Sequence, residues 1–383
     1  MLVINIYHMA PYPFYAGGID SWLDNFLRSI LDDGCKVNLF CFNADDLGLR
    51  TEVFTPIESP RLRIHYLPRI KRYITAPVWI AQYILAFKNT EFKALPSDLN
   101  IVLSTLPILP AVLLMWWLKI IRGRLICSVR GQIAQDCLDL EKPWLFSQVV
   151  KFVEGASLRR VDSIVANGTD TACYLEEFYS LKSTVAPNGV SEHFYARAES
   201  ESKGDTLASY SGKTTFLHVG TLRPVKGIDD VLMAYSLLNE KDRRRSVLIF
   251  IGKGMVEHYS EKARCLGIDA LFLGHKDNVA DYLRAADFVI NVSGGSGVSN
   301  ALVEALMLGK PVIAWNKQTF SQVINPSNGI LCTYKDHQSL RDAMYSCIYG
   351  NITFSSDRVA ESARAYRWPN VYRVWEQILS DRS

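Results

Sequence analysis

The stretch that decides the fold class is Ser293–Ile313, SGGSGVSNALVEALMLGKPVI. It follows Phe288–Val292, an apolar run with the β-branched and aromatic composition of a strand. A glycine-rich turn then leads into a helix that starts near Ser299 and Asn300, both good N-cap residues. The free amides at such a helix start can hold an anion or a polar ligand. A strand, a glycine turn and a helix in this order are typical of a parallel α/β domain.

Glu304 is the carboxylate of this helix. A helical wheel puts the alanines and leucines of the helix on a buried arc and Glu304 beside it, where it can point into a cleft. Taken alone, such a residue is more often an ordinary boundary carboxylate. Its place after the glycine turn makes it a candidate for ligand binding.

The same alternation of strands and helices extends outward and occurs in two series, which begin at Leu2–Tyr7 and Phe216–Val219. A chain of 383 residues is too long for one ordinary core. A polar stretch, 197–213, lies between the two series and is the expected linker. We therefore expect two Rossmann-like domains, 1–196 and 214–367, facing each other across a cleft lined by the loops at the carboxyl ends of their strands.

The segment Phe216–Ile228, FLHVGTLRPVKGI, places cations beside a second helix start. A strand ends at Gly220, Arg223 and Lys226 lie in the loop, and Gly227 opens the helix. Such cations suit a nucleotide diphosphate, because negative charge develops on it as it departs.

The amino-terminal half offers weaker signals. Gly17 and Gly18 lie between the first strand and the first helix, where glycine lets the backbone approach a diphosphate closely. Arg130 follows the strand Leu125–Val129, and the carboxyl end of a strand is where a cleft residue belongs.

These stretches together resemble the retaining GT-B glycosyltransferases of family 4 (glycosyl transferases group 1), which include sucrose synthase and many bacterial lipopolysaccharide and capsule enzymes. Glu304 takes the place of the family glutamate that hydrogen-bonds the nucleotide ribose, and Lys226 that of the phosphate-binding lysine. Ser296 stands where the family has a glutamate that contacts the donor sugar or its phosphate, and Thr221 where it has an arginine. We expect Arg223, two residues further on, to supply the missing charge.

The resemblance covers nearly the whole chain. Arg130 stands where many members have a histidine that projects towards the sugar. The family also implies that the last helix, within 368–383, returns to pack on the first domain. Further matching stretches are Gly17–Ile19, Pro187–Val190, Ile251–Gly254, Leu271–His275 and Ala285–Asp287.

The reaction that the resemblance implies is front-face transfer of a sugar, with retention, from a UDP- or GDP-sugar to a glycan or lipid-linked acceptor. No cofactor or metal is expected, because cations carry the charge and an Asp-x-Asp motif is absent from the sequence. Lys226, Arg130 and Arg223 are expected to act in catalysis. The residues expected to bind the donor are Gly17, Gly18, Gly220, Thr221, Lys226, His275, Ser296, Gly297, Ser299, Asn300 and Glu304.

A net charge of +3 gives no reason to expect a nucleic-acid partner. Cations nevertheless gather in 61–124, where ten basic and two acidic residues leave a net +8. Two aromatic, apolar stretches in this region, Ile74–Phe87 and Pro107–Ile121, indicate contact with an anionic membrane surface, and core helices are the alternative. Eight cysteines without CxxC pairs and the lack of a signal-peptide pattern favour a cytoplasmic protein, peripheral on the inner face of the membrane.

Two other functions remain open. A catalytically silent GT-B scaffold that binds nucleotide is favoured by the joint replacements at Thr221 and Ser296. A nucleotide-sugar epimerase on the same architecture would need acid and base groups in the cleft, and none is identifiable. A nicotinamide dehydrogenase is excluded, because no GxGxxG follows the first strand.

Overall fold

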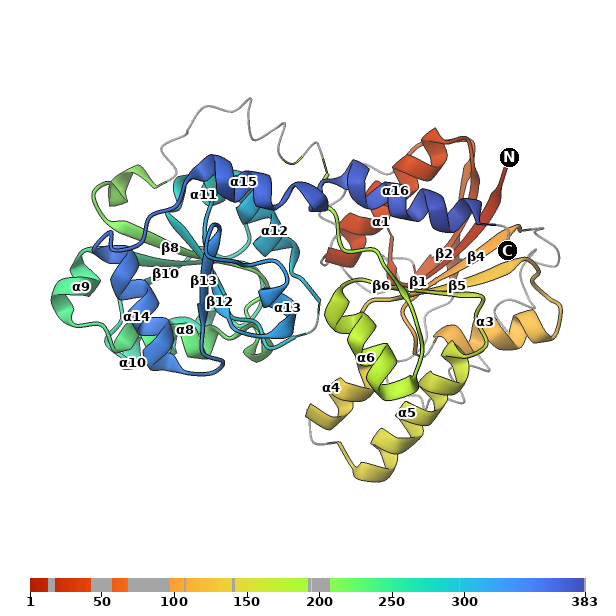
Figure 1. Ribbon diagram of the computed structural model, residues 1–383, viewed down its shortest axis with the longest axis horizontal. Coiled ribbons are helices and arrows are strands. Elements are labelled where there is room, and N and C mark those ends of the chain that lie inside the picture. Colours follow the sequence, from red (N-terminus) through yellow and green to blue (C-terminus); the bar gives the residue numbers. More distant parts are fainter. Residues whose placement is uncertain are drawn as a thin grey trace. The chain divides into compact units, whose positions relative to one another are not determined.

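The computed structural model describes residues 1–12, 18–42, 57–67, 97–106, 108–139, 142–191, 194, 207–295 and 297–381. The chain divides into two compact units, each drawn in Figure 1. Unit 1 comprises Met1–Asn188 with Tyr372–Ser383, and unit 2 comprises Gly189–Val371. The boundaries expected from the sequence, 1–196, 197–213 and 214–367, stay a prediction.

Unit 1 is built on a parallel sheet of seven strands in the order β3-β2-β1-β4-β5-β6-β7. The order reverses between β1 and β4, which creates a switch point at the carboxyl edge. The strands are β1 (Val3–Pro11), β2 (Lys36–Phe42), β3 (Leu62–Leu67), β4 (Leu99–Leu103), β5 (Arg124–Val129), β6 (Ser163–Ala166) and β7 (Thr184–Val185). The helices are α1 (Gly18–Asp32), α3 (Ile108–Trp117), α4 (Ile133–Asp139), α5 (Trp144–Leu158), α6 (Thr169–Tyr179) and the part of α16 (Trp368–Ser380) from Tyr372 onward.

The inner strands of this sheet are almost continuously apolar, as expected where helices cover both faces of a parallel sheet. The chain end takes part in this core. Trp375 of α16 packs against Trp22 and Phe26 of α1, with ring centroids 5.2 and 5.0 Å apart. Tyr372 also donates a hydrogen bond to Asp33 just after α1.

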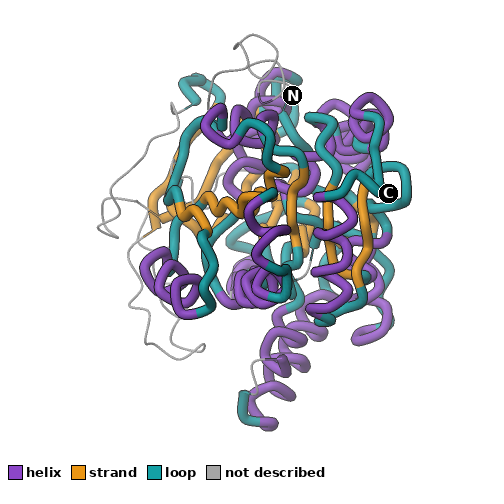
Figure 2. The backbone as a smooth tube through the Cα atoms, turned by 90° about the vertical axis from the view of Figure 1, so that its left-hand side faces the viewer, coloured by secondary structure: helices purple, strands orange, loops and turns teal. Residues whose placement is uncertain are grey.

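Unit 2 repeats the plan with a parallel sheet of six strands in the order β10-β9-β8-β11-β12-β13, and Figure 2 shows strands lying between layers of helices. Its switch point lies between β8 and β11. The strands are β8 (Thr214–Val219), β9 (Ser246–Ile251), β10 (Ala270–Phe272), β11 (Phe288–Asn291), β12 (Val312–Trp315) and β13 (Gly329–Cys332). The helical segments are η2 (Ala208–Tyr210), η3 (Pro224–Lys226), α8 (Ile228–Ser236), α9 (Glu240–Arg244), α10 (Val256–Cys265), α11 (Val279–Ala285), α12 (Asn300–Met307), α13 (Gln318–Ser321), α14 (His337–Ile348), α15 (Ser356–Ser362), η4 (Arg364–Tyr366) and the start of α16.

The prediction of two parallel α/β sheets is confirmed. Three strands that the sequence analysis did not single out, β3, β10 and β13, all lie at the edges of the sheets. Strand β3 interrupts its apolar residues with Arg63 and His65, whereas β10 and β13 are apolar runs of only three and four residues, most of them half-exposed.

The stretch Pro107–Ile121 is mainly a core helix. Six of the ten residues of α3 are buried, and only its end, with Trp117 at 73% exposure and Leu118, reaches the surface. The other stretch, Ile74–Phe87, lies outside the described residues. Among the helices that the structure describes, none combines the length and apolar character required to cross a bilayer.

Candidate active site

The two strongest sequence motifs meet at the switch point of unit 2. The backbone N–H of Gly294, after β11, donates to the carbonyl oxygen of Val225, after β8, at 2.8 Å. The Ser293 hydroxyl donates to the same oxygen at 3.3 Å. The loop that carries Lys226 and the glycine-rich turn therefore form one structure at the position where open α/β sheets bind ligands.

Glycine makes this close approach possible. Gly227 has φ +72°, and a Cβ atom there would lie 2.4 Å from the carbonyl oxygen of Val292. Gly252 has φ +152°, and its Cβ would lie 1.8 Å from the carbonyl oxygen of Gly220. A side chain at either position would push neighbouring strand ends apart.

Lys226 and Arg223 form a cationic pair beside the turn. Lys226 ends η3 and is partly buried, whereas Arg223 is exposed. Burial lowers the pKa of Lys226, and the charge of Arg223 lowers it further. The two cations thus lie close enough to repel each other, and an anion bound between them would relieve that repulsion. That Arg223 supplements Lys226 in binding a ligand stays a prediction.

His218 of β8 is a further polar group here, which the sequence analysis missed. Its Nδ1 lies 3.2 Å from the carbonyl oxygen of Ile290. Burial, followed by the charge of Lys226, lowers the pKa of His218 to about 4. The ring is therefore neutral at pH 7, and the Ile290 carbonyl requires the proton on Nδ1. Nε2 is then an acceptor, buried and without a hydrogen-bond partner in the described part of the chain.

The start of α12 is organised by Ser299. Its hydroxyl oxygen accepts a hydrogen bond from the backbone N–H of Leu302 at 3.3 Å, so Ser299 is the N-cap and Asn300 the first helical residue. The Asn291 side chain donates to the same hydroxyl at 2.6 Å. Asn300 Oδ1 is buried without a hydrogen-bond partner among the described residues. Gly297 takes φ +75° in the turn, where a left-handed conformation favours glycine.

Glu304 lies one turn further along α12, and Ser296 lies outside the described residues. Burial raises the pKa of Glu304 to about 7. A carboxyl group in this state is well placed to exchange its missing water contacts for the hydroxyl groups of a ligand.

A third cation, Lys317, supports the glycine turn from the loop after β12. Its ammonium group donates to the carbonyl oxygens of Gly294 at 2.7 Å and Gly295 at 3.5 Å. No local motif marked it, because its role depends on β12 lying beside β11.

His275 and Thr221 lie in adjoining loops of unit 2. The N–H of Gly252 donates to the carbonyl oxygen of Gly274 at 2.8 Å, which sets the His275 loop beside Gly252. His275 contacts the Asp277 carboxylate at 3.2 Å. Thr221, partly buried, directly follows Gly220, whose N–H donates to the end of β9 at 2.9 Å.

Arg130 is the candidate group of unit 1. Its guanidinium carbon lies 3.6 Å from the ring centroid of Trp22 in α1. Nη1 donates to Asn188 at 2.7 Å and Nε to Ser128 at 3.0 Å, while Nη2 is buried without a hydrogen-bond partner in the described residues. Burial lowers the pKa of Arg130 to about 9, so it remains charged at neutral pH. The arrangement leaves the Nη2 group of a rigid cation, with its two N–H donors, for an anionic or hydroxyl ligand.

Trp22 brings Arg130 to the start of α1, which begins at Gly18. Gly17 lies outside the described residues. Trp22 and Asn188 were missed as side chains that position Arg130. Asn188 belongs to the stretch Pro187–Val190, which the sequence marked only as one of the stretches that match the family.

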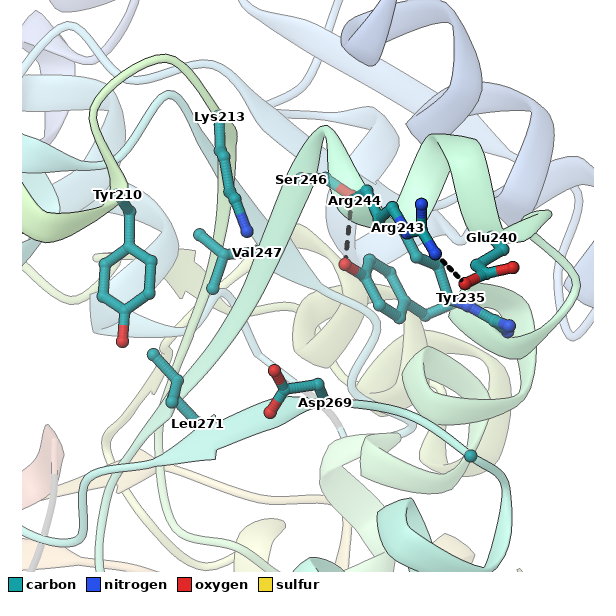
Figure 3. Close-up of a pocket in the computed structure, with 11 residues that line it drawn as sticks. Tyr210, Lys213, Tyr235, Glu240, Arg243, Arg244, Ser246, Val247, Asp269 and Leu271 are labelled. Carbon is teal, nitrogen blue, oxygen red and sulfur yellow. Dashed lines mark hydrogen bonds and ion pairs between the residues drawn. The ribbon is translucent and has the colours of Figure 1, made fainter.

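A cavity of about 370 Å³ lies at the opposite edge of the second sheet (Figure 3). It opens near the amino ends of β8, β9 and β10, so it does not belong to the loops described above. No group of histidine, cysteine or acidic side chains suited to a metal ion occurs in the part of the chain that the structure describes. The residues lining the cavity are Tyr210, Lys213, Tyr235, Glu240, Arg243, Arg244, Ser246, Val247, Gly267, Asp269 and Leu271.

The chain resembles known proteins over most of its length. Phosphatidyl-myo-inositol mannosyltransferase of Mycobacterium leprae is 25% identical over 286 residues, which are 70% of this chain and 71% of the relative. The structure of sucrose-phosphate synthase from Thermosynechococcus elongatus aligns with a TM-score of 0.76 at 17% identity, covering 99% of this chain and 100% of that one. Anabaena HepE in complex with UDP-glucose aligns with a TM-score of 0.73 at 16% identity, covering 100% of both chains.

Two family models divide the chain between them. The model described as Glycosyltransferase Family 4 matches residues 16–194, and the model described as Glycosyl transferases group 1 matches residues 213–349. The second match contains the loop of unit 2 that carries Lys226 and the helix α12 that carries Glu304. The structural neighbours share the fold with two parallel α/β sheets. The chain therefore belongs to the GT-B glycosyltransferases of family 4, group 1 type.

Proposed function

We propose that this glycosyltransferase moves a sugar, with retention at the anomeric carbon, from a UDP- or GDP-sugar to a glycan or lipid-linked acceptor in bacterial cell-surface polysaccharide assembly. The observation that carries the proposal is the hydrogen bond between Gly294 and Val225, which sets the Lys226 loop against the glycine turn. Cations and free helix amides then converge at one strand end, as the diphosphate of a sugar nucleotide needs.

The donor is recognised mainly by unit 2. The carboxyl group of Glu304 binds the ribose hydroxyls. The diphosphate binds to Lys226 and to the backbone amides at the start of α12. Binding of a hydroxyl-bearing ligand offsets the burial that raises the pKa of Glu304. The complex of Anabaena HepE with UDP-glucose, a protein of the same fold, supports a nucleotide-sugar donor.

Lys226 and Arg223 stabilise the leaving group. The bond between the anomeric carbon and the diphosphate oxygen breaks as the acceptor oxygen approaches from the same face of the sugar. Negative charge grows on the departing diphosphate, and the neighbouring cations Lys226 and Arg223 would neutralise it. No metal or cofactor is part of this proposal.

The acceptor is recognised mainly by unit 1, where Arg130 offers its Nη2 group just after the end of β5. A relative named for mannosyl transfer to phosphatidyl-myo-inositol supports a lipid-linked acceptor. We place the reaction on the cytoplasmic side of the membrane, where sugar nucleotides are made.

The test is to incubate the purified protein with a panel of nucleotide sugars, with and without lipid-linked saccharides, and to follow free UDP or GDP. We expect one donor to turn over, with loss of turnover in Lys226→Ala and Glu304→Ala. Retained nucleotide binding without turnover of any donor would overturn the proposal and favour a silent scaffold. Interconversion of the donor sugar without nucleotide release would favour an epimerase.

A further inference from the structure

The first half of α5 exposes large apolar side chains, in contrast to the usual surface helix. Trp144 is 72% exposed and Phe152 75% exposed. We call this set the α5 face; its members are Trp144, Leu145, Phe146, Val149 and Phe152. Exposed apolar residues gathered on one element usually mark an interaction surface.

The inward side of α5 is polar and buried. Glu154 is fully buried and accepts hydrogen bonds from the hydroxyls of Tyr174 and Tyr179, each at 2.7 Å. Ser147 and Ser157 are also buried on this side. Rotating α5 about its axis to bury the α5 face would expose these polar partners and break the hydrogen bonds to the Glu154 carboxylate. The bonds to Glu154 therefore hold the apolar side outward.

The outward side forms a continuous stripe. Leu145, Val149 and Phe152 are spaced i, i+4 and i+7, which places them on one face of a helix. Figure 1 shows α4 and the first half of α5 extending away from the strands of unit 1. The stripe thus lies on a projecting part of its own unit.

Cations bracket the stripe. Lys142 is exposed before the helix, and Arg159 and Arg160 are exposed after it. The only acidic residue in 142–160 is Glu154, which is buried. The exposed surface of this segment is therefore apolar and aromatic along its middle, where Lys151 is half-buried, and positive at its carboxyl-terminal end, while Lys142 follows Asp139 and Glu141 in the sequence.

We propose that the α5 face docks in the plane of an anionic lipid bilayer. Aromatic and aliphatic side chains would enter the boundary between headgroups and acyl chains, while Lys142, Arg159 and Arg160 meet the lipid phosphates. The exposed Arg159 and Arg160 beside the stripe complement the phosphates of anionic lipids, which favours a lipid surface over a second protein copy. This inference does not depend on the proposed reaction, since docking requires neither donor nor acceptor.

The experiment is sedimentation of the full-length protein with vesicles of phosphatidylcholine, alone or with about 30% phosphatidylglycerol. We expect binding to the anionic vesicles, and a loss of on the order of tenfold or more in the partition coefficient for the double variant Trp144→Ser, Phe152→Ser. Neutralising Lys142 and Arg160 to glutamine should weaken binding about fivefold for each cation removed, and salt should weaken it further.

Trp117→Ser is the matched control, because Trp117 is exposed to a similar extent on α3, in the stretch that sequence alone marked as a membrane contact. We expect it to reduce binding less than twofold. Equal binding by wild type and the α5 double variant, or loss of binding in Trp117→Ser alone, would overturn the proposal. So would sedimentation velocity that shows a wild-type dimer which the double variant converts to monomer.

Loss of docking is separable from loss of the reaction. The α5 variants are expected to release nucleotide from a donor as fast as wild type without vesicles, because they leave both strand-end sites untouched. Vesicle binding by a protein that turns over no donor would leave the docking proposal standing and the proposed function overturned.

Discussion

The two sheets hold their candidate groups in different ways. In unit 2 the main chain makes the site: amide-to-carbonyl bonds join the loops after β8, β9 and β11, and glycines allow contacts that no side chain would permit. In unit 1 side chains make it, because Trp22, Ser128 and Asn188 position Arg130.

This difference explains why the motifs were clearer in one half of the chain. A main-chain site requires glycine at set positions, so it leaves a pattern in the sequence. A side-chain site can be assembled from residues far apart, such as Trp22, Arg130 and Asn188, and leaves no local pattern. We therefore expect unit 2 to be sensitive to added volume and unit 1 to changes in side-chain shape.

The largest expected effect tests whether unit 2 supplies the cation that stabilises the departing diphosphate. Lys226→Ala should lower kcat by about 10² to 10³-fold, or about 3–4 kcal/mol, because the departing diphosphate loses its buried cation. Steady-state nucleotide release measures this. Lys241→Ala, an exposed lysine of α9 in the same unit, should change kcat less than twofold. Near-wild-type turnover by a folded Lys226→Ala protein would show that Lys226 of unit 2 does not stabilise the diphosphate.

The next effect tests the main-chain design itself. Gly252→Ala should lower the free energy of unfolding by about 3 kcal/mol, because its Cβ would meet the carbonyl oxygen of Gly220. Gly267→Ala is the control, since Gly267 also has a positive φ (+66°) but no atom lies within 4 Å of the point that an added methyl group would occupy. Gly267→Ala should lower the free energy of unfolding by only about 1 kcal/mol. Urea unfolding compares the two, and equal costs would mean that the loops do not require the close approach.

The third prediction concerns Glu304 of unit 2 and the dependence of the free energy of unfolding on pH. Its pKa is about 7 in the folded protein and 4.5 for a free glutamate, so the folded state binds more protons between these values. Stability should therefore fall by about 2–3 kcal/mol as pH rises from 4.5 to 7, and this contribution should be constant outside that window. Glu304→Gln should remove this part of the change in stability with pH. Urea unfolding at a series of pH values checks it; identical slopes would show that Glu304 is not buried as described.

The smallest effect concerns unit 1. Arg130→Lys keeps the charge but loses the planar stacking on Trp22 and the fork of N–H donors. We expect kcat/KM for the acceptor to fall about tenfold, while the Kd for the nucleotide stays the same. Arg122→Lys, at an exposed position before β5, is the control. A larger loss in nucleotide affinity than in acceptor use would assign Arg130 to the donor.

Much of the fold could be predicted from the sequence, since inner strands of a parallel sheet are continuous apolar runs bounded by glycine turns. The edge strands β3, β10 and β13 were not predicted, because Arg63 and His65 interrupt β3 and because β10 and β13 are apolar runs of only three and four residues. For the stretch Pro107–Ile121 the sequence left two interpretations, a membrane contact and a core helix. Most of α3 is buried, as the second interpretation predicts. The exposed apolar face of α5 could not be predicted, because its side chains are of the same types as core residues and only their exposure distinguishes them.

The sequence by itself determined the class of fold and the positions of the glycine turns, Lys226 and Glu304. These features are local: apolar periodicity selects strands and helices, and a positive φ selects glycine. Only the tertiary structure decided that Val225 meets Gly294, that His218 stays neutral, that Trp22 supports Arg130 and that α5 turns its apolar side outward. Those depend on which elements lie side by side, because burial and pairing are set by distant parts of the chain.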